Sequence, residues 1–125
     1  MYFVDRSAAL IKPKQPFLDW LKSIEENDLE ITLQQLQCEC NMFLIPSYNT
    51  PEEAVAYIDE IYLDLFKIEL SGWYEDPSVW PDDMSLKAFW EMFDISLHSM
   101  VIDTQEEDIQ NDPIFADVED IEDDE

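Results

Sequence analysis

The chain has 125 residues, of which 31 are acidic and six are basic, so its formal net charge is −25. Hydrophobic residues make up 46% of it and aromatic residues 13%, which is too apolar for a wholly disordered chain and suits one domain. The single glycine excludes a glycine-rich loop that could hold a phosphate or a dinucleotide. No apolar run is long enough to span a membrane, and the N-terminus lacks the basic-then-apolar pattern of a signal peptide. We therefore expect a cytoplasmic protein with no membrane partner.

The negative charge is concentrated toward the C-terminus. Four of the six basic residues lie in the first 22 positions, whereas the stretch from Asp103 to Glu125 holds twelve acidic residues and no basic ones. Such a run repels itself and carries too little apolar surface to offset the entropy of the chain. The sequence thus predicts one domain over residues 1–104 and a disordered acidic tail over residues 105–125.

The first quarter of the chain predicts a strand followed by a helix. Residues 3–12 begin apolar and end at Pro13, which cannot donate a hydrogen bond to a neighbouring strand. Pro16 suits the first turn of a helix, and apolar residues recur behind it at helical spacing. These residues are Phe17, Leu18, Trp20, Leu21 and Ile24. We expect the helix to end at Asn27 and Asp28.

A short helix and a second strand come next. Thr32 and Gln35 match the T-x-x-Q pattern of a capping box, which is typical of a helix start. The apolar run from Met42 to Ile45 is uninterrupted and is bounded by Pro46, so it predicts a buried strand.

The strongest local signal is a long helix over about residues 51–70. Thr50 is the expected cap, Pro51 takes the first helical position, and Glu53 completes a capping box. Gly72 lies where a helix end favours a left-handed residue. The expected buried face consists of Val55, Ile58, Ile61, Tyr62, Leu65 and Phe66. The opposite face consists of Glu52, Glu53, Asp59, Glu60 and Asp64, with Lys67 three residues after Asp64.

The remaining segments predict a loop, a helix and a third strand. In the loop over residues 73–83 we expect Trp73 and Trp80 to cover the edge of the core. Ser85 is the expected cap of a helix that turns Phe89, Trp90 and Phe93 inward, and residues 93–103 alternate as in a strand. The fold class is therefore α+β: a small three-stranded sheet with helices packed on one face, in the order strand, helix, helix, strand, helix, helix, strand.

Metal binding finds weak support in the sequence. Cys38 and Cys40 form a C-x-C pair, and His98 could add a third zinc ligand only if the fold brings it beside them. A paired C-x-x-C motif is missing. We expect reduced structural thiols, with no metal and no other cofactor.

Catalytic motifs are also sparse. Asp94, Ser96 and His98 alternate on one face of the third strand, but such side chains are about 7 Å apart, too far for a direct Ser–His–Asp relay. Adjacent carboxylate pairs arise by chance in so acidic a chain. We name no catalytic residue, and the sequence favours a binding role over an enzyme.

Three segments together are similar to a known group of proteins. They are IKPKQPFLDWL at 11–21, FLIPSYNTPEEAVAYI at 43–58, and ELSGWYEDPSVWP at 69–81 followed by FDISLHSMVID at 93–103. The chain resembles, over roughly residues 6–103, a family of small acidic bacterial proteins described as uncharacterised. The resemblance implies a bacterial cytosolic setting and no activity or functional residue.

The charge indicates which partners the protein could take. A negative field opposes nucleic acids and anionic membranes, and it favours a basic protein, polyamines or divalent cations, although acidity can also serve solubility alone. We expect an interaction module for a basic protein partner. The candidate partner-binding residues are Glu53, Glu60, Leu63, Asp64, Trp73 and Trp80. One alternative is a nucleic-acid mimic that inhibits a DNA- or RNA-binding protein, and another is a small enzyme or metal-binding protein.

Overall fold

The computed structural model describes residues 1–24 and 30–114. The expected helix end at Asn27 and Asp28, and the part of the expected acidic tail over residues 115–125, lie outside the described residues.

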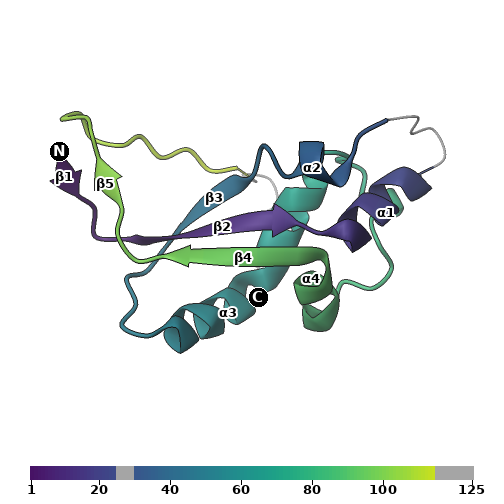
Figure 1. Ribbon diagram of the computed structural model, residues 1–125, viewed down its shortest axis with the longest axis horizontal. Helices are drawn as coiled ribbons and strands as arrows, with labels where there is room; N and C mark the ends of the chain where they lie inside the picture. Colours follow the sequence, from purple (N-terminus) through teal and green to yellow (C-terminus); the bar gives the residue numbers. More distant parts are fainter. Residues whose placement is uncertain (25–29, 115–125) are drawn as a thin grey trace.

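The main sheet has three antiparallel strands in the order β3-β2-β4 (Figure 1). They are β2 (Ser7–Pro13), β3 (Asn41–Ile45) and β4 (Phe93–His98). The central strand is the most buried, and its Ala9 lies opposite Phe43 on one side and Leu97 on the other. Small and β-branched residues at the centre suit a strand that pairs along both edges.

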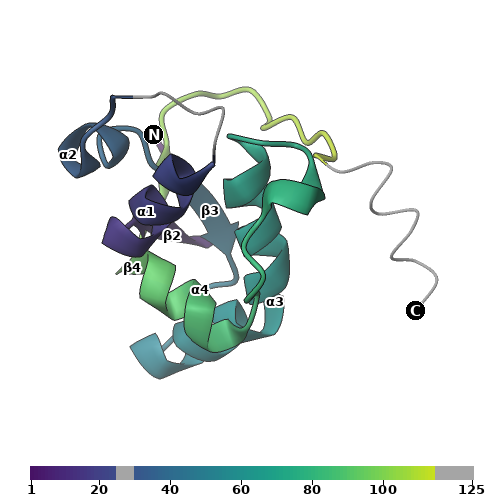
Figure 2. The same cartoon turned by 90° about the vertical axis from the view of Figure 1, so that its right-hand side faces the viewer.

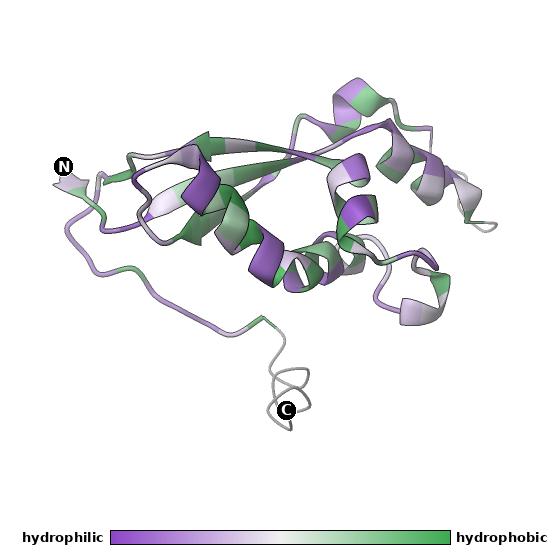
Figure 3. Ribbon diagram, turned by 90° about the horizontal axis from the view of Figure 1, so that it is seen from below, coloured by the Kyte–Doolittle hydropathy of each residue, from purple (hydrophilic) through white to green (hydrophobic). Residues whose placement is uncertain are grey.

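Helices cover one face of this sheet. They are α1 (Gln15–Ser23), α3 (Pro51–Ser71) and α4 (Leu86–Met92). The short α2 (Leu33–Leu36) packs against α1, and a 3₁₀ turn, η1, spans Pro77–Val79. Figure 2 shows α1, α3 and α4 grouped beside the strands, and Figure 3 shows α3 running beneath the sheet. The predicted α+β class is confirmed. None of the described helices is long and apolar enough to cross a membrane.

Aromatic rings fill the space between the helices and the sheet. Phe93 lies at the centre, with ring centroids 5.2 Å from Phe17, 5.7 Å from Phe66 and 5.3 Å from Phe89. All four side chains are buried. The tilted and edge-on geometries of these pairs are favourable for phenyl rings, so one cluster joins α1, α3, α4 and β4.

The first and third predicted strands are each interrupted. The expected strand over residues 3–12 is divided into β1 (Tyr2–Phe3) and β2, and the one over residues 93–103 into β4 and β5 (Ile102–Asp103). β1 and β5 pair with each other as a separate two-stranded sheet. Two segments of the chain leave the main sheet here, and the buried Ser7 of one donates its hydroxyl to the Ser99 carbonyl of the other, 3.1 Å away. The periodicity of the sequence does not predict this hydrogen bond.

The expectation of a buried strand at residues 42–45 is wrong for two of its side chains. Met42 and Leu44 are 55% and 49% exposed, whereas Ile45 is buried. β3 is an edge strand, and helices cover one face only, so alternate side chains point away from the core. An uninterrupted apolar run does not reveal this alternation.

The structure confirms the predicted helix caps. Thr32 and Gln35 form both hydrogen bonds of the capping box, and the Ser85 hydroxyl accepts from the Ala88 amide at 3.1 Å. Thr50 caps α3 by accepting from the Glu53 amide at 3.3 Å. The Glu53 carboxylate, however, accepts from the Asn49 amide rather than the Thr50 amide that the capping box requires.

Two further expectations for α3 need correction. Gly72 follows the helix with φ −64° and ψ −21°, so it is right-handed rather than left-handed. Val55 is 37% exposed while Ala54 is buried, and Ile61 is only half-buried. The buried face is therefore rotated toward Ala54, Ile58, Leu65, Phe66, Glu69 and Leu70.

The expected inward-facing Trp90 is half-buried as well, and its indole N–H donates to Asp59.

Candidate functional site

The predicted acidic face of α3 points to solvent. Glu53, Glu60 and Asp64 are exposed, and Leu63 beside them is 38% exposed. Asp59 differs, because its carboxylate accepts from the Trp90 indole at 2.8 Å and is half-buried. Within the described residues the ion pairs are Arg6–Asp5 and Lys87–Glu91, so the acids of this face form no ion pair. Lys67, three residues after Asp64, is the basic residue of the face.

The two candidate tryptophans lie beyond the other end of α3. Trp80 is half-buried, and its indole N–H donates to the Tyr74 carbonyl at 2.8 Å. Trp73 is 39% exposed. Since a helix rises about 1.5 Å per residue, roughly 30 Å separates Glu53 from Trp73. The structure therefore does not gather the six candidate residues into one site.

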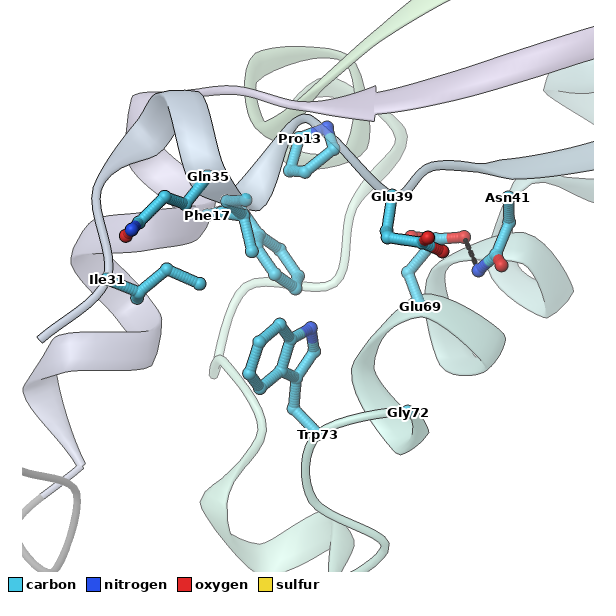
Figure 4. A pocket seen from close by; sticks show the side chains of 10 residues that line it. Pro13, Phe17, Ile31, Gln35, Glu39, Asn41, Glu69, Gly72 and Trp73 are labelled. Atoms are coloured by element: carbon cyan, nitrogen blue, oxygen red, sulfur yellow. Dashed lines mark hydrogen bonds between the residues drawn. The ribbon is translucent and has the colours of Figure 1, made fainter. Parts of the chain in front are cut away.

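A cavity of about 450 Å³ opens at the C-terminal end of α3, beside Trp73. Three separate segments of the chain line it. The lining residues are Pro13, Phe17, Ile31, Gln35, Leu36, Glu39, Asn41, Glu69, Gly72 and Trp73. Figure 4 shows Phe17, Ile31 and Trp73 on one side of this cavity, and Glu39, Asn41 and Glu69 on the other. The cavity thus has an apolar wall and an acidic wall.

The acidic wall contains a buried carboxylate. Glu69 is 9% exposed, and its Oε2 accepts a hydrogen bond from Asn41 Nδ2 at 2.8 Å. Burial raises the pKa of Glu69 because it penalises the charged form, while the Asn41 hydrogen bond acts in the opposite direction. Glu39 adds an exposed carboxylate from the loop before β3.

Backbone and side-chain hydrogen bonds hold the walls in place. The Trp73 amide donates to the Leu70 carbonyl at 3.0 Å, which continues the last turn of α3 into the apolar wall. Gln37 Nε2 donates to the Pro13 carbonyl at 2.8 Å and ties the α2 segment to the end of β2. Phe17 is fixed by its aromatic contacts in the core.

The electrostatic character of the cavity is negative. None of the residues that line it is basic, and the last turn of α3 carries no basic residue. Lys12, whose charge acts on the neighbouring Cys40 thiol, is not part of the lining. The carboxyl end of a helix also bears a partial negative charge. The cavity therefore favours a cation over an anion.

The possible zinc ligands do not meet. Cys40 lies just before Asn41, which pairs opposite Ile11, whereas His98 pairs opposite Ala8 toward the other end of the sheet. Both cysteines are free thiols, and burial raises the pKa of Cys40. No group of three histidine, cysteine or acidic side chains suitable for a metal ion occurs in the described part of the chain.

Ser96 and His98 are closer than expected. Their side chains lean together on β4, so that Ser96 Oγ and His98 Nε2 are 2.9 Å apart and within hydrogen-bonding distance. The separation of about 7 Å holds for backbone positions, and long side chains can span it. Both residues are exposed and neither lines the cavity, so this contact alone does not make a catalytic site.

Sequence reasoning missed Glu69 and Asn41, the polar centre of the cavity. One signal for Glu69 was available: it lies four residues after Leu65 and three after Phe66, on the apolar face of α3. An acid at that spacing is a buried charge that needs a partner. Asn41 gave no comparable signal, because its partner is 28 residues away.

Comparisons with known proteins add no further assignment: no family model, curated protein or solved structure matches the chain. The resemblance to small acidic bacterial proteins stays a prediction.

Proposed function

We propose that the protein is a small acidic interaction module that binds a basic protein partner in the bacterial cytoplasm. The observation that supports the proposal is the exposed face of α3. Its acids Glu53, Glu60 and Asp64 form no ion pair among the described residues, and the exposed Leu63 lies next to Asp64. Lys67 is the one basic residue of this face. A row of carboxylates that outnumbers its basic neighbours attracts a cationic surface over several ångströms and raises the rate of association.

The alternative of a nucleic-acid mimic is less favoured. Duplex DNA presents one charge per about 1.7 Å of its axis, so a mimic needs dense rows of free carboxylates. The face of α3 is sparser than this, and the Trp90 hydrogen bond to Asp59 engages one of its acids. The remaining arrangement suits a partner with a few scattered lysines and arginines.

The test is the rate at which a captured partner associates with the protein as ionic strength rises. Screening limits exposed charges to about 8 Å at physiological salt, so the rate should fall steeply. The triple variant Glu53→Gln, Glu60→Gln, Asp64→Gln should associate more slowly and depend less on salt. A flat salt dependence for the unaltered protein contradicts the proposal.

A matched control removes the same charge elsewhere. Glu30, Glu75 and Glu106 are exposed acids outside α3, and changing all three to Gln removes the same three negative charges as the α3 variant does. If this control slows association as much as the α3 variant does, total charge rather than the α3 face attracts the partner.

A further inference from the structure

We propose that the cavity at the end of α3 binds a lysine or arginine side chain, with its charged group on Glu69 and its apolar stem along Trp73. The proposal rests on the proposed function in one respect, that a basic protein supplies the side chain. It assigns a ligand class to residues that lie outside the acidic face of α3.

The dimensions of the cavity suit such a ligand. Its volume of about 450 Å³ lies within the range of about 300–1,000 Å³ found for ligand pockets. Trp73 is 39% exposed at its mouth, whereas Phe17 and Glu69 are buried deeper. A side chain that enters beside Trp73 can therefore keep its stem on apolar surface and place its charged end near the carboxylate.

Glu69 is the group that would accept the cation. Of its two oxygens, Oε2 accepts from Asn41, and no donor to Oε1 occurs among the described residues. Since no buried side-chain oxygen of the described residues lacks a partner, Oε1 is open to solvent and can be reached by a ligand. An ammonium or guanidinium group would donate to the second oxygen and offset the loss of solvation.

The aromatic wall contributes in two ways. The indole of Trp73 provides apolar contact for a methylene stem, and its exposed ring attracts cations. Phe17, which is almost fully buried, provides apolar surface deeper in the cavity. A bare metal ion takes oxygen ligands and would gain nothing from this wall.

The only glycine of the chain provides a direct probe of this site. Gly72 lines the cavity, so protein labelled with ¹⁵N-glycine alone gives one amide signal, and that signal reports on the cavity. We would titrate the full chain with Nα-acetyl-lysine amide and with Nα-acetyl-arginine amide at physiological salt. The neutral controls are Nα-acetyl-norleucine amide and Nα-acetyl-citrulline amide.

The cationic probes should shift the Gly72 signal in a saturable way, and the neutral probes should not. The stronger of the two cationic responses identifies the preferred group. Glu69→Gln should weaken binding by about tenfold or more, because a charge-assisted hydrogen bond is lost while the amide oxygen can still accept from Asn41. Glu106→Gln, which removes the same charge at an exposed position outside both α3 and the cavity lining, should bind as the unaltered protein does.

Trp73→Leu provides a second variant in case Glu69→Gln does not fold. The residue is partly exposed, and its loss should weaken both cationic probes without changing the charge of the protein. Equal shifts with neutral and cationic probes, or undiminished binding by Glu69→Gln, would overturn the proposal. If the acidic face of α3 does not attract a basic protein, the result of this titration is unaffected. The small probes need neither that face nor a protein partner.

Discussion

Asn41 donates a hydrogen bond to Glu69 across 2.8 Å, joining the first residue of β3 to the last turn of α3. This is a polar link at the rim of a core that consists mainly of phenyl rings and aliphatic side chains. It holds the edge strand of the sheet against the end of the longest helix, and both residues line the same cavity. Its strength depends on the ionisation of Glu69.

The stability of the protein should therefore depend on pH through Glu69. Burial raises its pKa in the folded protein, so the folded state holds this proton up to a higher pH than the unfolded chain does. The contribution of Glu69 to stability is complete below its ordinary pKa and is lost as pH rises through the raised, folded-state value. Glu69→Gln has no charge to bury, so its stability relative to the unaltered protein should increase over that interval.

Urea unfolding of both proteins between about pH 5 and about pH 8 measures this difference. The range stays above the isoelectric point of about 4.1, where solubility is lowest. All other acidic residues are common to the two proteins, so their titration largely cancels in the comparison. A difference that stays constant with pH would show that Glu69 titrates normally.

Removal of the donor should destabilise the protein. Asn41→Ala leaves the buried Glu69 carboxylate without its hydrogen bond, at a cost of about 1–3 kcal/mol at neutral pH. Asn49→Ala is the matched control, because Asn49 is exposed and uses its backbone amide in the contact with Glu53, so the change should stay within about 0.5 kcal/mol. Equal unfolding free energies for the two variants would contradict a stabilising role for the Asn41 hydrogen bond.

The sequence predicts α3 well because its signals are local. Thr50 and Pro51 mark its start, and apolar spacing follows within each turn. The rotation of the helix about its axis is predicted less well, since Val55 is more hydrophobic than Ala54 and the sequence pattern places it in the core. In the structure the smaller Ala54 is the buried residue. Hydrophobicity alone does not report how closely a helix approaches its neighbours.

The cavity and the sheet edges could not be predicted in the same way. The cavity is lined by residues around positions 13–17, 31–41 and 69–73, and no local pattern connects these segments. Likewise, Met42 and Leu44 form part of an apolar run whose exposed side depends on where the helices pack. Such features depend on tertiary arrangement, whereas capping and periodicity depend on neighbours in sequence.

Gly72→Ala should be tolerated. The residue has φ −64°, and an added Cβ would meet the Glu69 carbonyl oxygen at 3.6 Å and the Ile68 carbonyl oxygen at 3.8 Å, which are ordinary contacts. Alanine also restricts the unfolded chain, so we expect a gain of about 0.4–1 kcal/mol in chemical denaturation. A loss of stability instead would indicate the left-handed conformation that the sequence suggested.

The buried face of α3 can be tested with two truncations. Ile58 is fully buried, and Ile58→Ala should cost about 2–5 kcal/mol because it leaves a cavity. Val55→Ala should change stability by about 0.5 kcal/mol or less, since Val55 is 37% exposed and alanine favours the helix. Thermal or urea unfolding of both variants is the measurement, and a larger cost for Val55→Ala would contradict the rotation of the helix.

Deletion of residues 105–125 should leave the fold intact. In residues 105–114 every side chain is exposed, including Ile109 at 55% and Ile114 at 69%. Residues 105–109 line an open hollow beside β1, but that contact buries little of them.

The deletion removes eleven acidic residues and no basic ones, so it relieves repulsion with the acidic domain. We expect a slightly higher melting temperature at low salt and no difference at high salt, where screening removes the repulsion. A fall of more than about 5 °C would correspond to about 1 kcal/mol of lost contacts and would show that this segment stabilises the domain.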